Sequence, residues 1–392
     1  MLPLNQIDLT LPGLLQHYRN GDFTPAQLIK TLQAEFAQDT SNPIWIHALS
    51  AEEIAPYLER LADKKPDDLP LYGIPFAIKD NIDLAGIPTT AACPAYAYTP
   101  QHSAKVVELL VAAGAIPLGK TNLDQFATGL VGVRSPEPWG PCHNAFNSDY
   151  ISGGSSSGSA LAVAKGWASF ALGTDTAGSG RVPAALNNIV GLKPSKGLLS
   201  TQGLVPACRS LDCISIFALT CADASRVLDT VAVHDPADAF SRPNPYSNSR
   251  RYFGPPATVP VIGVPASAEL EFFGDKGAQR CFEKTLEQIR ALGWQTREIS
   301  ITPFITAARL LYQGPWVAER TLVAQSLLEQ QPKALLPVIK RILEGGLDLS
   351  AMDAFRAQYQ LQDLIQQVQP LLAQVDAIIT PTIGTTYRID AV

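Results

Sequence analysis

The sequence Gly153-Gly-Ser155-Ser-Ser-Gly158-Ser159 decides the fold of this chain, together with Gly173-Thr-Asp-Thr-Ala-Gly178-Ser179-Gly-Arg181. A third segment, Gly73-Ile-Pro-Phe-Ala-Ile-Lys79-Asp-Asn81, precedes them. Glycine allows the backbone to approach a substrate closely, so serine hydroxyls beside glycines can meet a reacting group. A lysine and two serines can act as base and nucleophile without a histidine. The three segments therefore favour hydrolysis of an acyl compound.

Each of these residues also has a structural interpretation. A lysine after the apolar run Ile74–Ile78 is often a surface charge at a strand end, whereas burial yields the neutral amine that a base needs. Ser179 also fits the N-terminal cap of a helix. Gly154-Ser-Ser-Ser-Gly158 matches a nucleophile elbow centred on Ser156, but that motif needs a later acid and histidine, and only His234 follows.

The three segments resemble those of the amidase signature family, whose members use a Ser–cis-Ser–Lys triad. The spacing agrees, with 76 residues from Lys79 to Ser155 and 24 from Ser155 to Ser179. The resemblance implies that Ser179 is the nucleophile, Ser155 the bridging serine after a cis Gly154–Ser155 bond, and Lys79 the base. It also implies the α/β fold of the family, a mixed central β-sheet covered by helices on both faces.

Three further stretches resemble the allophanate hydrolases of urea breakdown. They are Ala127-Thr-Gly-Leu-Val-Gly-Val-Arg-Ser135, Thr176-Ala-Gly-Ser-Gly-Arg-Val-Pro-Ala184 and Ala207-Cys-Arg-Ser-Leu-Asp-Cys-Ile-Ser-Ile-Phe217. This narrower resemblance implies an amidase that hydrolyses allophanate (urea-1-carboxylate) and releases ammonia. A urea carboxylase is then the expected functional partner, and a homodimer the expected assembly.

The resemblance also assigns residues around the substrate. It places an oxyanion hole at the backbone N–H groups of Thr176, Ala177, Gly178 and Ser179. The segment Leu310–Arg320 resembles the part of allophanate hydrolases that binds the substrate carboxylate, and this implies roles for Tyr312 and Arg320. A guanidinium can bind a carboxylate through two parallel hydrogen bonds. If residues 303–329 form one helix, Tyr312 and Arg320 can share a face, although Pro315 bends it; a surface ion pair with Glu319 is the alternative for Arg320.

Weaker candidates complete the site. Gly129 and Arg134 are expected in the pocket wall. The remaining polar residues of the motifs are expected to fix the geometry of the loops, and they are Asp175, Arg181, Arg209 and Asp212.

Composition excludes several other classes of protein. The chain has 392 residues, of which 46% are hydrophobic and 17% charged, as in globular proteins. A net charge of −6 without a Lys/Arg cluster argues against nucleic-acid binding. No basic leader and no apolar run of about 18 residues occur, so we expect neither secretion nor membrane insertion. The six cysteines form no C-x-x-C pair, so we expect no metal or other cofactor and a cytoplasmic location.

Two segments are expected along the chain: an N-terminal helical segment over residues 1–65 and an amidase-signature catalytic domain over 66–392. The latter resembles a domain truncated at its C-terminus, without a separate C-terminal domain. Helices are predicted over 6–62, 104–113, 155–167, 282–292, 303–329, 332–344 and 350–374, and the sequence Thr24-Pro-Ala-Gln27 predicts a helix start within the first of these. A strand and turn are predicted over 70–82, and strands over 115–118, 168–172, 259–264 and 376–382. A long surface connection is predicted over 235–258.

Three other functions remain open from the sequence alone. The chain fits a different amidase-signature hydrolase of small amides, or an amidotransferase-type subunit that acts on aminoacyl-tRNA. Its acidic charge disfavours the second of these. A non-catalytic assembly subunit is the third, and the presence of all three triad residues argues against it.

Overall fold

The computed structural model describes residues 2–244, 256 and 258–392. The chain divides into two compact units. One contains Met1–Arg250, Val323–Lys340 and Arg388–Val392, and the other contains Arg251–Leu322 and Arg341–Tyr387. The division expected at residue 65 stays a prediction, and half of the residues in the connection expected over 235–258 lie outside those described.

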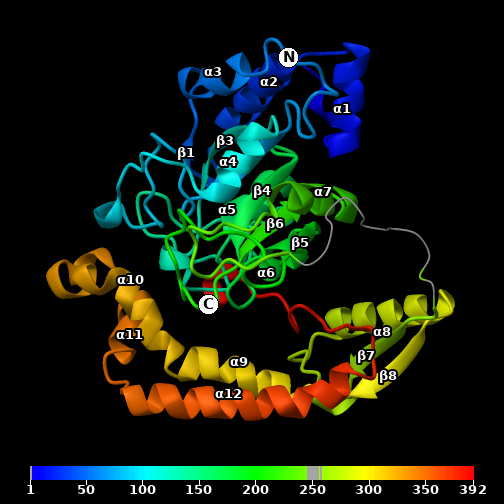
Figure 1. Ribbon diagram of the computed structural model, residues 1–392, viewed down its shortest axis with the longest axis vertical. Helices are drawn as coiled ribbons and strands as arrows, with labels where there is room; N and C mark the ends of the chain where they lie inside the picture. The colour runs from blue at the N-terminus through cyan, green and yellow to red at the C-terminus, as the bar shows by residue number, and fades with distance from the viewer. Residues whose placement is uncertain (1, 245–255, 257) are drawn as a thin grey trace. The chain divides into compact units, whose positions relative to one another are not determined.

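A six-stranded mixed sheet forms the centre of the first unit (Figure 1). Its strands, in spatial order, are β1 (Trp45–Ala48), β3 (Ile116–Thr121), β2 (Pro75–Lys79), β4 (Phe170–Thr174), β6 (Ile214–Ala218) and β5 (Val190–Leu192). β2 runs parallel to both β3 and β4, whereas the pairs β1–β3, β4–β6 and β5–β6 are antiparallel. The predicted mixed central sheet is therefore confirmed.

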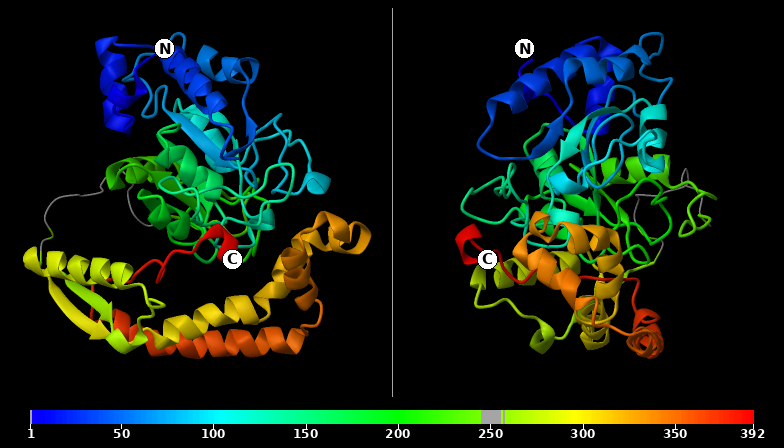
Figure 2. Two further views of the ribbon diagram at one scale, coloured as in Figure 1. Left: turned by 180° about the vertical axis from the view of Figure 1, so that it is seen from behind. Right: turned by 90° about the vertical axis from the view of Figure 1, so that its left-hand side faces the viewer.

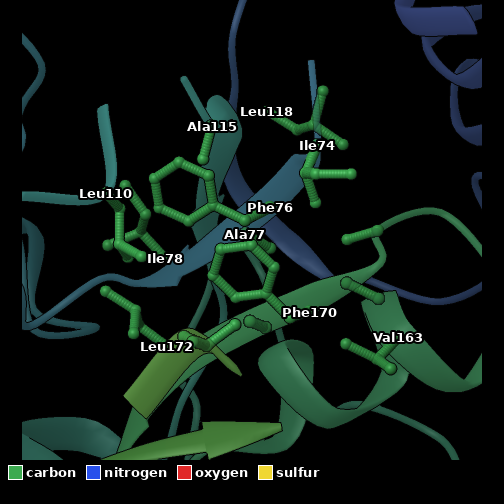
Figure 3. Packing of buried hydrophobic residues seen from close by; sticks show 14 of the residues in the cluster. Ile74, Phe76, Ala77, Ile78, Leu110, Ala115, Leu118, Val163, Phe170 and Leu172 are labelled. Carbon is green, nitrogen blue, oxygen red and sulfur yellow. The ribbon is translucent and has the colours of Figure 1, made fainter. Parts of the chain in front are cut away.

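β2 and β4 each direct alternate side chains to opposite faces of the sheet. Large side chains occupy one of these faces, where the rings of Phe76 and Phe170 stack with centroids 5.1 Å apart. Figure 3 shows Leu110 of α4 (Lys105–Ala112) beside Ile78 on that face. α4 also packs on α7 (Cys221–Val231).

The other face of these strands carries small residues and receives α5 (Ser157–Ala164). A Cβ atom at Gly173 would lie 2.8 Å from Ser156 Oγ, so the start of α5 lies directly on β4. Gly158, within α5, also packs closely on the backbone, because a Cβ atom at this position would lie 2.4 Å from Ile44 O. The glycines of the motif thus let the helix that follows Ser155 sit against the ends of the strands.

The N-terminal residues form α1 (Leu11–Asn20), α2 (Pro25–Gln38) and α3 (Ala51–Glu59). The predicted start at Thr24 is confirmed, because its side chain caps Gln27 N and the Gln27 side chain returns to Thr24 N. The helical prediction for residues 6–62 is wrong at Trp45–Ala48, which forms β1. Aromatic and β-branched residues there favour a strand, and pairing with β3 satisfies their backbone.

A second, parallel sheet belongs to the other unit, with the order β8 (Gln295–Ile299), β7 (Val261–Pro265) and β9 (Ala377–Ile378). Its long helices include α8 (Lys276–Ala291), α9 (Thr302–Gln313) and α12 (Ala351–Leu372). α9 and α12 lie side by side in all the views (Figure 2). The strand predicted over 376–382 shortens to Ala377–Ile378, because Pro381 has no N–H for a ladder.

Two helices run across the division between the units: α10 (Trp316–Gln330) and α11 (Pro337–Gly345). The single helix predicted over 303–329 is wrong, since α9 ends at Gln313 and α10 begins at Trp316. Pro315 lacks the N–H that a continuous helix requires, and Gly314 is extended. The remaining short elements are α6 (Arg181–Leu186) and the 3-10 turns Leu4–Gln6, Pro94–Tyr96, Gln125–Ala127, Ser267–Glu269, Pro332–Ala334 and Ile389–Ala391.

Within the described ranges, every helix is too short or too polar to cross a bilayer.

We predict that Gly158→Ala destabilises the chain by about 2 kcal/mol, although alanine normally favours a helix over glycine by about 1 kcal/mol. The new methyl group would meet the backbone atoms Ile44 O at 2.4 Å and Asn122 N at 2.7 Å, which cannot rotate away. Guanidinium unfolding measures the change. Gly345→Ala in α11 is the control, because nothing lies within 4 Å of its Cβ position. Equal unfolding free energies for the two variants would contradict the prediction.

Candidate active site

Lys79 lies at the carboxyl end of β2 and is fully buried. Its Nζ donates to Ser155 Oγ at 2.7 Å and to Thr174 Oγ1 at 2.6 Å. Thr174 ends β4, which pairs in parallel with β2, so both strands deliver their last side chains to the same edge of the sheet. The structure therefore brings the predicted base and the predicted bridging serine into contact.

The environment of Lys79 favours its neutral form. Burial is the main cause, and it lowers the pKa of Lys79 from 10.5 to about 7, while the charges of Asp124, Asp212 and Asp175 act in the opposite direction. The two groups that contact the amine directly are hydroxyls. The lysine is therefore poised to accept a proton near neutral pH.

The neighbouring lysine is held differently. Lys120, on β3, is also fully buried, but its Nζ lies 3.0 Å from Asp80 Oδ1 and 2.9 Å from Thr89 Oγ1. A direct ion pair of this kind stabilises the charged amine. Of these two buried lysines, Lys79 is the one suited to be a base.

Ser155 follows a cis peptide bond, Gly154–Ser155, as the family resemblance implied. Its side chain is fully buried beside the Lys79 amine. The neighbouring Ser156 has a different environment, because its hydroxyl donates to Thr174 O and accepts from Thr174 N. His234 is exposed. These contacts give Ser156 a structural role and disfavour the nucleophile elbow.

Ser179 lies in the turn between β4 and α6, and it is almost fully buried. Its hydroxyl donates to Gly129 O at 3.3 Å, and its carbonyl accepts from Ser156 N at 3.4 Å. The predicted nucleophile thus contacts both the cis-serine segment and the predicted pocket-wall residue Gly129.

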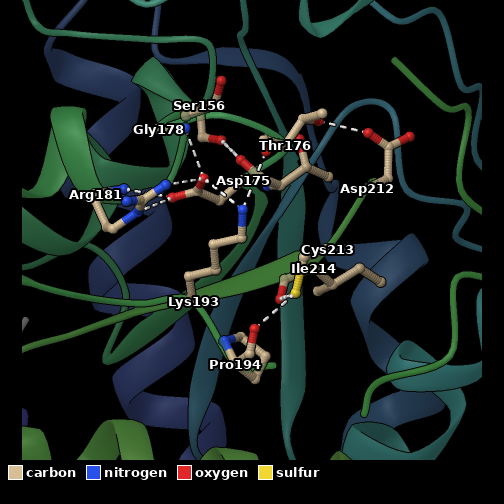
Figure 4. A network of polar contacts seen from close by, with 12 residues as sticks. Ser156, Asp175, Thr176, Gly178, Arg181, Lys193, Pro194, Asp212, Cys213 and Ile214 are labelled. Carbon is tan, nitrogen blue, oxygen red and sulfur yellow. Dashed lines mark hydrogen bonds and ion pairs between the residues drawn. The ribbon is translucent and has the colours of Figure 1, made fainter. Parts of the chain in front are cut away.

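Asp175 holds this turn in place (Figure 4). Its carboxylate accepts two hydrogen bonds from the Arg181 side chain, at 2.8 and 2.9 Å, and one from Gly178 N at 2.7 Å. Lys193 Nζ lies 3.4 Å away. Burial alone would raise the pKa of Asp175, but Arg181 and Lys193 outweigh it and lower the pKa to about 2. Asp175 and Arg181 therefore have the scaffolding contacts expected from the sequence.

The predicted oxyanion donors are partly engaged within the protein. Gly178 N donates to Asp175, so this donor serves the turn itself. The Thr176 side chain donates to Asp212 Oδ1 at 2.5 Å (Figure 4). Asp212 also accepts from Ala207 N and Cys208 N. Asp212 therefore fixes the turn 176–179 as expected. The oxyanion hole at this turn, with Ala177 and Ser179, stays a prediction.

The sequence analysis missed two residues of this site, Thr174 and Asp124. Thr174 lies inside the quoted motif as the last strand residue, and a hydroxyl at the end of a strand parallel to β2 was the available signal. Asp124 follows β3, and its fully buried carboxylate accepts from Arg134 N at 2.7 Å and Gly132 N at 3.2 Å. Nothing in its local sequence marked it as a site residue.

Three further predicted residues, Arg134, Tyr312 and Arg320, lie in different parts of the chain. The Arg134 guanidinium donates to Thr128 O at 3.0 Å within the first unit. Tyr312 lies in α9, half exposed, and Arg320 lies in α10, 8% exposed. The idea that Tyr312 and Arg320 share one helix face is wrong, because the break at Gly314 and Pro315 separates their helices.

In the part of the chain that the structure describes, no group of three His, Cys, Asp or Glu side chains lies so as to hold a metal ion.

Comparisons with known proteins identify the family of this chain and its similar relatives. Residues 30–389 match the amidase family. Urea amidolyase of Saccharomyces cerevisiae is 48% identical over 342 residues, which are 86% of this chain and 18% of that protein. Urea amidolyase of Lachancea kluyveri is 44% identical over 93% of this chain and 20% of its own length. The chain thus spans about a fifth of these relatives.

A solved structure extends the similarity to three dimensions. Allophanate hydrolase of Kluyveromyces lactis superposes with a TM-score of 0.89 and 38% identity, over 98% of this chain and 62% of that one. A different relative, a glutamyl-tRNA(Gln) amidotransferase subunit of Acidobacterium capsulatum, is 36% identical over 84% of this chain and 74% of its own length.

The Asp175 carboxylate predicts a specific dependence of stability on pH. Because its pKa is lower in the folded chain than in the unfolded chain, ionisation of Asp175 stabilises the fold above pH about 4, and this contribution is lost as the pH falls toward 2. Asp175→Asn should cost about 2 kcal/mol of unfolding free energy at pH 7 and almost nothing near pH 2. Chemical unfolding across this range measures it, with Asp63→Asn, an exposed carboxylate, as control. A deficit independent of pH would show that the charge is not responsible.

Proposed function

The chain belongs to the amidase family, and we propose that it hydrolyses the amide C–N bond of allophanate, from which it releases ammonia. The observation that carries the chemistry is the buried Lys79 amine, 2.7 Å from Ser155 Oγ and with a pKa of about 7. The choice of allophanate is supported by the 38% identity to an allophanate hydrolase over 98% of the chain.

In the proposed reaction, neutral Lys79 accepts the proton of Ser155 as Ser155 accepts that of Ser179. Ser179 Oγ attacks the amide carbonyl of allophanate and forms a tetrahedral oxyanion. The N–H groups of the turn 176–179 other than that of Gly178 stabilise this oxyanion, and Asp175 and Asp212 hold the turn in place. The C–N bond breaks as the proton returns through Ser155 to the leaving nitrogen, which departs as ammonia. Water then hydrolyses the acyl-enzyme by the same proton path.

Recognition of the substrate carboxylate is the second part of the proposal. We assign it to Arg320 and Tyr312, on the resemblance of the segment Leu310–Arg320 to allophanate hydrolases. Arg320 is almost fully buried, and a buried guanidinium binds a carboxylate more strongly than an exposed one. Gly129, whose carbonyl accepts from Ser179, and Arg134 belong to the wall of the pocket next to the nucleophile.

A urea carboxylase is the proposed source of allophanate. Two of the relatives that match are urea amidolyases about five times as long as this chain, so there the amidase segment forms part of a larger protein. A homodimer and a cytoplasmic location complete the proposal. A second candidate, an amidotransferase subunit that uses glutamine, is favoured by the 36% identity to such a subunit.

Ammonia release from fresh allophanate, malonamate, acetamide and glutamine tests the substrate. We expect a preference for allophanate and a loss of about 10⁴-fold or more in kcat for Ser179→Ala, with an unchanged circular-dichroism spectrum. Arg320→Ala should lower kcat/KM for the two carboxylated small amides by about 10–100-fold and spare acetamide.

Arg341→Ala, an exposed arginine on α11, is the matched control and should match the unaltered chain. Turnover of glutamine above allophanate would favour the amidotransferase function. Equal effects of Arg320→Ala on acetamide and allophanate would remove the carboxylate anchor.

The pH profile tests the base. Because the neutral form of Lys79 is the active one and its pKa is about 7, kcat/KM should fall about tenfold for each pH unit below 7 and level off above it. Lys79→Arg keeps the positive charge at all these pH values and should be inactive. A rate that stays flat from pH 5 to pH 8 would contradict the role of Lys79.

A further inference from the structure

Asp124 is a fully buried carboxylate that the reaction described above does not use. It follows β3 and lies at the start of the loop that includes Gly129 and Arg134. Its Oδ1 accepts from Arg134 N at 2.7 Å and its Oδ2 from Gly132 N at 3.2 Å. Both oxygens accept hydrogen bonds, as those of an ionised carboxylate do. These bonds close the loop around the carboxylate.

The same residue contacts the cis-serine segment. Asp124 N donates to Ser155 O at 3.1 Å. A Cβ atom at Gly154 would lie 2.2 Å from Asp124 Oδ2, and one at Gly129 would lie 2.3 Å from it. The carboxylate therefore packs directly on the Cα atoms of both glycines, one before Ser155 and the other bonded through its carbonyl to the Ser179 hydroxyl. A side chain at either glycine would displace it.

Asp124 also contributes charge near the proposed base. Burial lowers the pKa of Lys79, and the negative charge of Asp124 is the largest of the opposing influences, ahead of Asp212 and Asp175. Burial is the main influence and raises the pKa of Asp124 above its usual value, although the N–H groups of Arg134 and Gly132 and the charges of Arg134 and Lys79 act in the opposite direction. Asp124 thus acts on Lys79 through space, while Ser155 and Thr174 occupy the direct contacts of the amine.

We propose that Asp124 is a positioning residue of the reaction proposed above, on which this inference rests: its carboxylate locks the cis-serine segment to the Gly129–Arg134 loop and places a negative charge beside the Lys79 amine. Its geometric part aligns the two serines through Gly154 and Gly129. Its electrostatic part keeps the amine basic enough to draw the proton from Ser155.

The Asp124 carboxylate does not contact the Lys79 amine directly, unlike the carboxylate that faces Lys120. Asp80 contacts Lys120 directly at 3.0 Å and forms a buried ion pair with it. A carboxylate in the same direct contact with Lys79 would keep it protonated at neutral pH. Asp124 instead uses both oxygens to bind backbone N–H groups, so it raises the basicity of Lys79 without occupying its lone pair.

Asp124→Asn tests both parts, because it removes the charge at nearly constant shape. Its amide also turns an N–H group toward a backbone N–H donor, which loosens the loop. We expect the acid limb of the pH profile for amide hydrolysis to move about one unit toward lower pH. The plateau rate should fall roughly 100-fold from misplacement of the serines.

Direct titration of Lys79 separates this inference from the proposed function. It uses ¹³C-labelled lysine in the inactive Ser179→Ala chain, with the Lys79 signal identified by its absence in Lys79→Met. Asp124→Asn should lower the midpoint of this signal by about one pH unit. Asp223→Asn is the matched control, since Asp223 is a buried carboxylate whose described hydrogen bonds run to Leu11 N and Thr220.

The possible outcomes are distinct. An unchanged Lys79 midpoint in folded Asp124→Asn, or an equal shift in Asp223→Asn, would overturn the electrostatic role. An unchanged plateau rate would overturn the geometric role. If the unaltered chain hydrolyses no amide, the proposed function fails, and the titration still decides the charge of Asp124.

A measurement on the unaltered chain covers a variant that does not fold. The ¹³C signal of the Asp124 carboxyl group should be that of an ionised carboxylate at pH 8, where Lys79 is neutral. A protonated signal at this pH would overturn the inference.

Discussion

Removal of the Lys79 amine from water is the constraint on which the rest of the site depends. An amine at the end of a buried strand loses its proton near neutral pH only if solvent is excluded and no carboxylate touches it. The sheet supplies the first condition, with stacked Phe76 and Phe170 on one face and α5 on the other. Hydroxyls of Ser155 and Thr174 supply the second, because they accept and relay hydrogen bonds without adding charge.

Glycine makes this burial compatible with catalysis. The absence of side chains at Gly158 and Gly173 lets α5 approach the ends of the strands, so that Ser155 reaches a lysine which no bulk solvent reaches. The turn that carries Ser179 is fixed by charge instead, through Asp175 and its bidentate contact with Arg181. Close packing thus fixes the segment of Ser155, and ion pairing fixes the turn of Ser179, while the hydrogen bond from Ser156 N to Ser179 O joins the two.

Sequence motifs identified site residues where reactive side chains occur at a characteristic spacing. They did not identify residues whose role depends on contacts formed only in the folded chain. Lys79 and Ser155 were marked by their motifs, because glycine, serine and lysine at that spacing have few structural uses together. The cis bond before Ser155 was implied by the family resemblance alone. Asp124 was missed because a single aspartate after a strand looks like an ordinary turn residue, and only the folded chain places it on two glycines. The segment Trp45–Ala48 was misassigned because four residues are too few to show a period.

The full burial of Lys79 has a further chemical meaning. Urea in water is in equilibrium with isocyanic acid, which carbamoylates neutral amines and leaves ammonium groups almost untouched. An amine with a pKa of about 7 would be vulnerable to this reaction in any cell that accumulates urea. Full burial keeps the Lys79 amine out of contact with bulk solvent, so the packing that makes it a base also limits this side reaction.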